Sequence, residues 1–266
     1  MSGAIADHYR AGQGPPLFLI HGYTATWPIW GPTLARLSEH YDVLAATLPG
    51  HTGGPPAPEG DDISELVDAL ERMLDEVGWD QAHIAGFSLG GWMTLELAKR
   101  GRARTATAFA PGGARTEHEA SESRYIRTSF ARQHVGARLI EPWLNELTRH
   151  PRFRREAMSD QMVDGRRVHP ADAARIIRDF AHTPVFWRFW KRIGRGDHLD
   201  DAGRIDVPVS VVWGAKDRVL RQRAHQPFFE RELPQATFTT LPRAGHVPFW
   251  DDPDGVVAAI RDRARD

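Results

Sequence analysis

Short apolar runs alternate with longer amphipathic stretches in the first 112 residues. Four runs consist almost entirely of apolar side chains: 16–20, 43–48, 83–87 and 105–110. Runs without polar alternation are typical of strands that are buried on both faces of a parallel sheet. Between them, residues 62–77 repeat apolar side chains at spacings of three and four, and residues 89–100 form a second helical stretch. This order of elements predicts an α/β fold.

The pattern changes after residue 112. The segment 113–203 is helical and polar in character, and it contains no run typical of a buried strand. The earlier alternation then resumes in three elements, which are strands at 207–213 and 236–241 and a helix at 254–265. We therefore predict a mostly parallel, doubly wound sheet built by residues 1–112 and 204–266. The helical segment 113–203 is predicted to be an insertion at the edge of the sheet where ligands bind.

Composition and charge exclude several classes of protein. The 266 residues include 41% hydrophobic and 26% charged side chains, which is enough apolar material for a core. The net charge of −1 gives no general reason to bind nucleic acid or an anionic membrane surface. The chain contains no cysteine, which excludes disulfides, thiolate metal sites and a cysteine nucleophile. We expect a small-molecule substrate and no nucleic-acid partner, and the oligomeric state stays open.

Targeting and cofactor signals are not found either. No apolar run approaches the about 18 residues of a membrane span, and residues 1–14 lack the pattern of a secretory signal. We therefore expect a cytoplasmic protein without membrane insertion. The histidines and carboxylates show no H-E-x-x-H or comparable ligand spacing, so we expect neither a metal nor an organic cofactor.

A glycine-rich turn between a predicted strand and a predicted helix carries the first chemical signal. Residues 86–90 read Gly-Phe-Ser-Leu-Gly, which matches G-x-S-x-G in the strand–turn–helix context of a nucleophile elbow. Such a turn holds Ser88 in a strained conformation and lifts its hydroxyl clear of the sheet. It also directs the Leu89 amide toward the place where an oxyanion would form. The alternative is an ordinary turn in which Ser88 caps the helix.

A second oxyanion donor is predicted after the first buried strand. The sequence His21-Gly22-Tyr23 follows that strand at the edge where ligands bind in this architecture. The Tyr23 amide would then join that of Leu89 in an oxyanion hole. In the alternative interpretation, Gly22 only turns the chain and His21 is a packed residue.

A serine nucleophile needs a base and an orienting acid, expected in the order Ser, Asp, His. Asp217 follows the strand at 207–213, and His246 follows the strand at 236–241, so both lie in loops at the same edge. His51 and His225 compete for the base, and Asp206, Asp251 and Asp252 compete for the acid. Asp206 lies at the wrong end of its strand. Asp251 and Asp252 are interpreted as surface or N-cap residues of the last helix.

Four motifs together carry a resemblance to a known family: HGYTAT, GFSLGG, VPVSVVWGAKD and AGHVPFWDDP. From about residue 14 to the C-terminus, the chain resembles the serine branch of the α/β-hydrolase superfamily with a helical cap. The resemblance implies Ser88 as nucleophile, His246 as base and Asp217 as acid, with the Tyr23 and Leu89 amides as oxyanion hole. Many members have proline after the acid loop, whereas Arg218 follows Asp217 here. Serine at the elbow argues against dehalogenase and epoxide-hydrolase chemistry, which uses aspartate in this family.

The resulting hypothesis is a serine esterase. It would cleave a carboxylic ester of a small, largely apolar substrate through an acyl-enzyme. The same three residues also suit a lactonase, a carbon–carbon bond hydrolase or a perhydrolase. A member of another class, a non-catalytic binding protein on the same fold, is the remaining alternative.

Aromatic residues near the predicted site are candidates for its pocket. The five candidates are Trp27, Trp30, Phe186, Phe189 and Trp190. The last three lie on one apolar face of a predicted helix within 113–203. That face either attaches the cap to the core or lines an apolar pocket. Trp27 and Trp30 could similarly line the pocket or fill the core.

Overall fold

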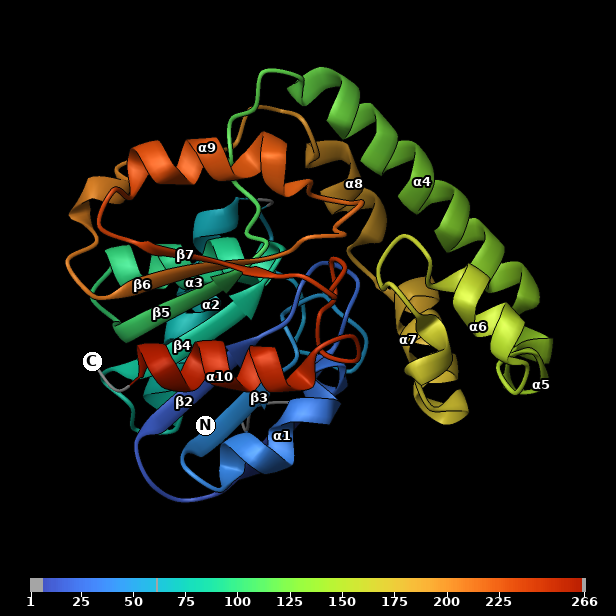
Figure 1. The fold of residues 1–266 in the computed structure, drawn as a ribbon, viewed down its shortest axis with the longest axis horizontal. Helices are drawn as coiled ribbons and strands as arrows, with labels where there is room; N and C mark the ends of the chain where they lie inside the picture. The colour runs from blue at the N-terminus through green and yellow to red at the C-terminus, as the bar shows by residue number, and fades with distance from the viewer. Residues whose placement is uncertain (1–6, 61, 265–266) are drawn as a thin grey trace.

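The computed structural model describes residues 7–60 and 62–264, and Figure 1 shows its central sheet with helices around it. The seven-stranded sheet has the order β1-β3-β2-β4-β5-β6-β7, and every strand pair is parallel except β1 with β3. The strands are β1 (His8–Ala11), β2 (Pro16–Ile20), β3 (Asp42–Ala46), β4 (Ala82–Phe87), β5 (Ala103–Phe109), β6 (Val209–Gly214) and β7 (Thr237–Leu241). The predicted fold class is confirmed.

Helices cover both faces of the sheet because its central strands are apolar on both sides. Phe18 and Ile20 of β2 belong to a core shared with three helices, α2 (Ile63–Glu76), α3 (Leu89–Lys99) and α9 (Gln222–Glu232). Leu17 and Leu19 of the same strand face a second core with α1 (Gly31–Ser38) and α10 (Pro253–Arg263). Side chains alternate between the two faces of a strand, so one apolar run supplies both cores.

The segment between β5 and β6 is helical, as the sequence predicts. Its helices are α4 (Glu119–Ile140), α5 (Leu144–Leu147), α6 (Pro151–Ala157), α7 (Pro170–His182) and α8 (Phe186–Arg192). Figure 1 shows α4, α6 and α7 beyond the end of the sheet toward which the β4 arrow points. The longest helix, α4, packs against α7. This placement puts the helical segment (residues 113–203) next to the loops that follow the parallel strands.

One strand was not predicted. β1 pairs only with β3 and lies at the edge of the sheet, and its four side chains alternate between exposed and half-buried. A short edge strand needs no apolar run, so it carries no such signal in the sequence. Within residues 7–60 and 62–264, no helix has both the length and the apolar character needed to cross a membrane.

Candidate active site

Ser88 occupies the turn between β4 and α3 in a backbone conformation that is rare for residues with a side chain. Its φ is 56° and its ψ is −119°. The turn leaves no room beside it: a Cβ on Gly86 would lie 2.2 Å from the Gly90 oxygen, and one on Gly90 would lie 2.4 Å from the His21 oxygen. The two glycines of the motif are therefore required by close backbone contacts.

Backbone hydrogen bonds hold this strained turn in place. The Ser88 amide donates to the Phe109 carbonyl at 2.9 Å, and the Ser88 carbonyl accepts from Trp92 at 3.1 Å and Gly112 at 3.0 Å. The Ser88 hydroxyl makes no capping hydrogen bond to α3. The alternative interpretation, in which Ser88 is a helix cap, therefore does not describe this turn.

His246 and Asp217 form a buried pair at the ends of neighbouring strands. Asp217 Oδ2 accepts a hydrogen bond from His246 Nδ1 at 2.8 Å, and neither side chain is more than 3% exposed. The other carboxylate oxygen, Oδ1, accepts from the amides of Val219 and Leu220 at 2.8 and 2.9 Å. These bonds fix the carboxylate in a loop and leave it oriented toward the imidazole.

Asp251 is buried and binds the loop that carries His246 through hydrogen bonds. This corrects its interpretation as a surface or helix-capping residue. It is 3% exposed, and its carboxylate accepts hydrogen bonds from the amides of Gly245, Val163 and Asp164 at 2.9, 2.9 and 3.2 Å. One carboxylate therefore connects the loop of His246 to residues 163–164, which follow α6. The neighbouring Asp252 does cap α10, by accepting from the Gly255 amide at 3.2 Å.

The loop after β2 reaches the serine turn from the other side. A Cβ on Gly22 would lie 3.1 Å from the Ser88 Cβ, so the two turns are in close contact. His21 holds this loop: its Nδ1 donates to the Gly22 carbonyl at 2.7 Å, and its Nε2 accepts from the Leu48 amide at 2.8 Å. Complete burial lowers the pKa of His21 well below its usual value, so the ring is neutral and structural.

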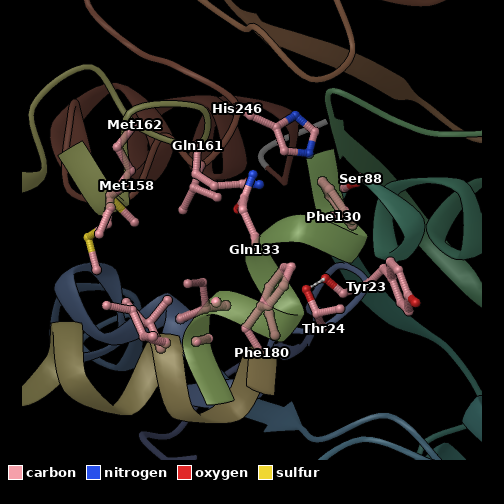
Figure 2. A pocket seen from close by; sticks show the side chains of 18 of the residues that line it. Tyr23, Thr24, Ser88, Phe130, Gln133, Met158, Gln161, Met162, Phe180 and His246 are labelled. Atoms are coloured by element: carbon pink, nitrogen blue, oxygen red, sulfur yellow. Dashed lines mark hydrogen bonds between the residues drawn. The ribbon is translucent and has the colours of Figure 1, made fainter. Parts of the chain in front are cut away.

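Two cavities meet at this turn, and Tyr23, Ser88 and Phe130 line both. Cavity 1 has a volume of about 260 Å³, and His246 is also one of its wall residues. Figure 2 shows Ser88 and His246 on the same side of cavity 1, opposite Met158 and above Phe180. The rest of its wall comes largely from apolar side chains of the helical segment, with the amides of Gln133 and Gln161 among them.

Cavity 2 has a volume of about 200 Å³ and lies on the Leu89 side of Ser88. Its wall includes Trp92 of α3, Phe189 of α8 and His225 of α9, as well as charged residues of the helical segment. Ser88 is therefore accessible from two chambers of different chemical character.

Comparisons with known proteins identify the family of the chain. Residues 17–259 match the alpha/beta hydrolase family. The protein of Mycobacterium tuberculosis named epoxide hydrolase EphH is 32% identical over 199 residues, which cover 73% of this chain and 91% of that protein. The chain belongs to the alpha/beta hydrolase family. The predicted resemblance is thereby confirmed at the level of the family.

Other relatives of this alpha/beta hydrolase carry different names. A pimeloyl-[acyl-carrier protein] methyl ester esterase of Neisseria meningitidis is 26% identical over 257 residues, covering 92% of each chain. The solved structure of the enol-lactonase from Burkholderia xenovorans LB400 superimposes with a TM-score of 0.76 at 21% identity, covering 98% of this chain and 96% of the other. At that identity the likeness shows the fold alone.

Trp27 and Trp30, predicted as candidates for the pocket, line neither cavity of this alpha/beta hydrolase. Trp30 is fully buried against Phe249, with ring centroids 4.2 Å apart. Trp27 packs on Tyr9, and its indole donates to Asp7 at 3.0 Å. Trp30 therefore fills the core and Trp27 flanks it, whereas Ile29, between them on the same 3₁₀ helix (Trp27–Trp30), lines cavity 1.

The three aromatic residues of α8 separate into different roles. Phe189 lines cavity 2, as the pocket hypothesis requires. Phe186 is fully buried and stacks on Tyr23, whose hydroxyl donates to the Phe186 carbonyl. Trp190 donates from its indole to the Arg127 carbonyl at 2.7 Å and lies under the Arg127 guanidinium. Phe186 and Trp190 line neither cavity 1 nor cavity 2, and they attach α8 to the core and to α4.

Of the competing residues, His51 and Asp206 lie away from the position of a base or an acid, whereas His225 lines a cavity together with Ser88. His51 is buried beside His21, and burial lowers its pKa to about 4. Asp206 is exposed before β6. His225 lies on α9 and lines cavity 2. Sequence reasoning missed Gln133 and Gln161 because no motif surrounds them and only the folded helical segment brings them to the serine.

Proposed function

We propose that this alpha/beta hydrolase is a serine hydrolase that cleaves carboxylic esters of small, largely apolar substrates. One observation carries the proposal: Ser88 in its strained turn and His246, which is paired with the buried Asp217, line the same apolar cavity. A nucleophile, a base and an orienting carboxylate are the groups that acyl transfer requires.

In the proposed reaction, His246 removes the hydroxyl proton as Ser88 Oγ attacks the ester carbonyl carbon. The amides of Leu89 and Tyr23 stabilise the oxyanion, because Leu89 is the first residue of α3 and its N–H has no acceptor within the helix. His246 then protonates the leaving alcohol, and water attacks the acyl-enzyme by the same route. Asp217 holds Nδ1 protonated, so that Nε2 is the basic nitrogen.

The helical segment 113–203 acts as a cap over a core of residues 1–112 and 204–266 in this proposal. Its side chains, Phe130 and Phe180 among them, form much of the wall of cavity 1 (Figure 2). A wall of this kind excludes water and selects the substrate by size and polarity, while the core supplies the reacting groups.

Serine at the turn favours an ester over an epoxide, despite the name of the relative in M. tuberculosis. Attack of a serine oxygen on an epoxide carbon would give an ether, which water does not cleave under these conditions. Attack on an ester gives an acyl-enzyme, which is itself an ester and is hydrolysed. The same chemistry opens a lactone, which makes lactone hydrolysis the second candidate, supported by the fold shared with an enol-lactonase.

Ser88→Ala tests the proposal directly. We expect hydrolysis of p-nitrophenyl acetate to fall at least about a thousandfold, because the covalent route is lost. A fluorophosphonate should label the wild-type protein at Ser88, and the variant should not be labelled. Ser159→Ala, outside both cavities, is the matched control and should keep the wild-type rate. The proposal would be refuted if Ser88→Ala kept a rate within tenfold of wild type or if another residue were labelled. A wild-type protein that is not labelled would favour a binding protein.

A further inference from the structure

The two cavities beside Ser88 differ in charge. Among the described residues, cavity 1 is lined by no aspartate, glutamate, lysine or arginine. Cavity 2 is lined by Glu119, Glu122 and Asp197 and by one arginine, Arg192. Arg192 is already bound to Asp197, with 2.6 Å between its Nη2 and the carboxylate. Two carboxylates of cavity 2 are therefore not balanced by an arginine or lysine of its wall.

A buried histidine in the wall of cavity 2 lacks hydrogen bonds. His225 is 7% exposed, and neither of its ring nitrogens has a hydrogen-bond partner among residues 7–60 and 62–264. The carboxylate of Glu122 is 3.6 Å from Nε2, beyond hydrogen-bond distance, and it already accepts from the Thr116 hydroxyl at 2.7 Å. A buried polar group without a partner destabilises the fold unless a ligand or water binds it.

Burial lowers the pKa of His225, although Glu122 and Asp217 act in the opposite direction. The neutral ring has one N–H donor and one acceptor nitrogen. Next to it, Glu122 has only acceptor oxygens. Together these two residues offer one donor and several acceptors to a group in cavity 2, without a positive charge.

We propose that cavity 2 binds an uncharged hydroxyl group of the substrate through His225 and Glu122, while an apolar portion of the same substrate occupies cavity 1. This inference rests on the proposed function, because the scissile bond must then lie at Ser88, where the cavities meet. The substrate class is an ester with a hydroxylated part on one side of the bond and a hydrocarbon part on the other.

The chemistry of the wall selects a hydroxyl over other groups of similar size. A hydroxyl donates to the Glu122 carboxylate and accepts from the His225 N–H, so the carboxylate and one ring nitrogen of His225 each gain a partner. A methyl group would leave both unpaired, which is strongly disfavoured in a buried site. A carboxylate would be repelled by the excess of acidic groups. An ammonium group would be attracted by Glu122 but cannot accept a hydrogen bond from a His225 N–H, so it would pair only with the acceptor nitrogen of the ring.

Matched esters test this selection. One set varies the alcohol side and the other the acyl side, and each ends in a methyl, hydroxyl, ammonium or carboxylate group at equal chain length. In wild-type protein we expect the hydroxyl ester to exceed the methyl ester in kcat/KM by at least about tenfold in one of the two sets. The carboxylate ester should be the poorest substrate of that set.

Two variants connect the preference to these residues. His225→Phe and Glu122→Leu should each reduce the hydroxyl-to-methyl ratio of kcat/KM to less than about threefold. The ratio is measured within each variant, so a general loss of activity does not affect it. Glu141→Leu is the matched control, because Glu141 also faces a histidine, His182, at 2.8 Å but lines neither cavity. It should keep the wild-type ratio.

Binding to the Ser88→Ala variant separates this inference from the proposed function. Calorimetry of the uncleaved esters should show the hydroxyl ester binding at least about tenfold more tightly than the methyl ester. If p-nitrophenyl acetate is hydrolysed but no ester set shows the hydroxyl preference, the inference is wrong and the proposed function stands. A preference for ammonium or carboxylate, or a ratio unchanged in both variants, also overturns it. Selective binding without any hydrolysis would instead refute the proposed function alone.

Discussion

The loops at the end of the sheet and the helices that face them are stabilised by different interactions. The loops approach each other so closely that a Cβ on Gly214 would lie 2.1 Å from the Gly245 oxygen, and backbone hydrogen bonds connect them. The helical segment is attached to a larger extent by side chains, such as Phe130 and Phe186, which both stack on Tyr23, although the Gln161 carbonyl also accepts a hydrogen bond from the Val247 amide. Positions fixed by the backbone suit the reacting groups, while side-chain packing lets the cavity walls change.

This difference predicts large effects on rate at the sheet and small effects in the helices. The largest is expected for Asp217→Asn, which removes the charge that stabilises the imidazolium and the orientation of His246. We expect kcat for p-nitrophenyl acetate to fall about ten-thousandfold. The exposed Asp206→Asn is the control and should be nearly silent. A fall of less than tenfold for Asp217→Asn would show that another carboxylate orients the base.

Asp251→Ala should give the next largest effect, because it removes the acceptor of three backbone amides. We expect a loss of about 3 kcal/mol in the free energy of unfolding, since charge-assisted buried bonds are lost. The displacement of the His246 loop should also lower kcat about a hundredfold. Urea unfolding and steady-state kinetics measure the two effects. Asp254→Ala, at an exposed position of α10, is the control and should change neither the stability nor kcat. Equal stability of the two variants would contradict the structural role of Asp251.

Ile177→Trp in the wall of cavity 1 should change selectivity rather than chemistry. The larger side chain fills part of the cavity, so we expect kcat/KM for long-chain esters to fall about tenfold relative to acetate. A chain-length series of esters measures the change. Val135→Trp, on the exposed face of α4, should leave the profile as it is. If both variants shift the chain-length profile equally, cavity 1 does not bind the hydrocarbon chain of the ester.

Trp190→Ala should have the smallest effect on catalysis and a clear one on stability. The variant loses the hydrogen bond to Arg127 and the cation–π contact, so we expect a lower melting temperature and a loss of about 2 kcal/mol. The chain-length profile should stay unchanged, because the side chain lines neither cavity. A shifted chain-length profile at unchanged stability would show that Trp190 contacts the substrate.

Much of the sheet and the positions of the candidate triad could be predicted from the sequence. Apolar runs indicated β2 through β6, because strands buried on both faces leave a continuous signal, and β7, which is largely exposed, was placed by its position before the last helix. Ser88, Asp217 and His246 are candidates for a related reason: each follows a predicted strand of a parallel sheet, so one local rule predicts all three at the same edge.

The walls of the site could not be predicted in the same way. Periodicity indicated that one face of α8 is buried, but it does not show what the face packs against, so Phe186 and Trp190 were assigned together with Phe189. Asp251 was misjudged because its partners Val163 and Asp164 are far away in sequence. Contacts between distant segments depend on tertiary packing, which leaves no local pattern.

The hydrogen bonds around Asp251 also determine which part of the helical segment can open. The Val247 amide donates to the Gln161 carbonyl at 2.8 Å, next to the three bonds of Asp251. Together they tie residues 161–164 to the loop of the proposed base. A motion that lifted this side of the cap would displace His246 along with it. On this geometry the protein would be inactive whenever it opened there, and hydrogen exchange at the Val163 and Gly245 amides would report the fraction of molecules in that state.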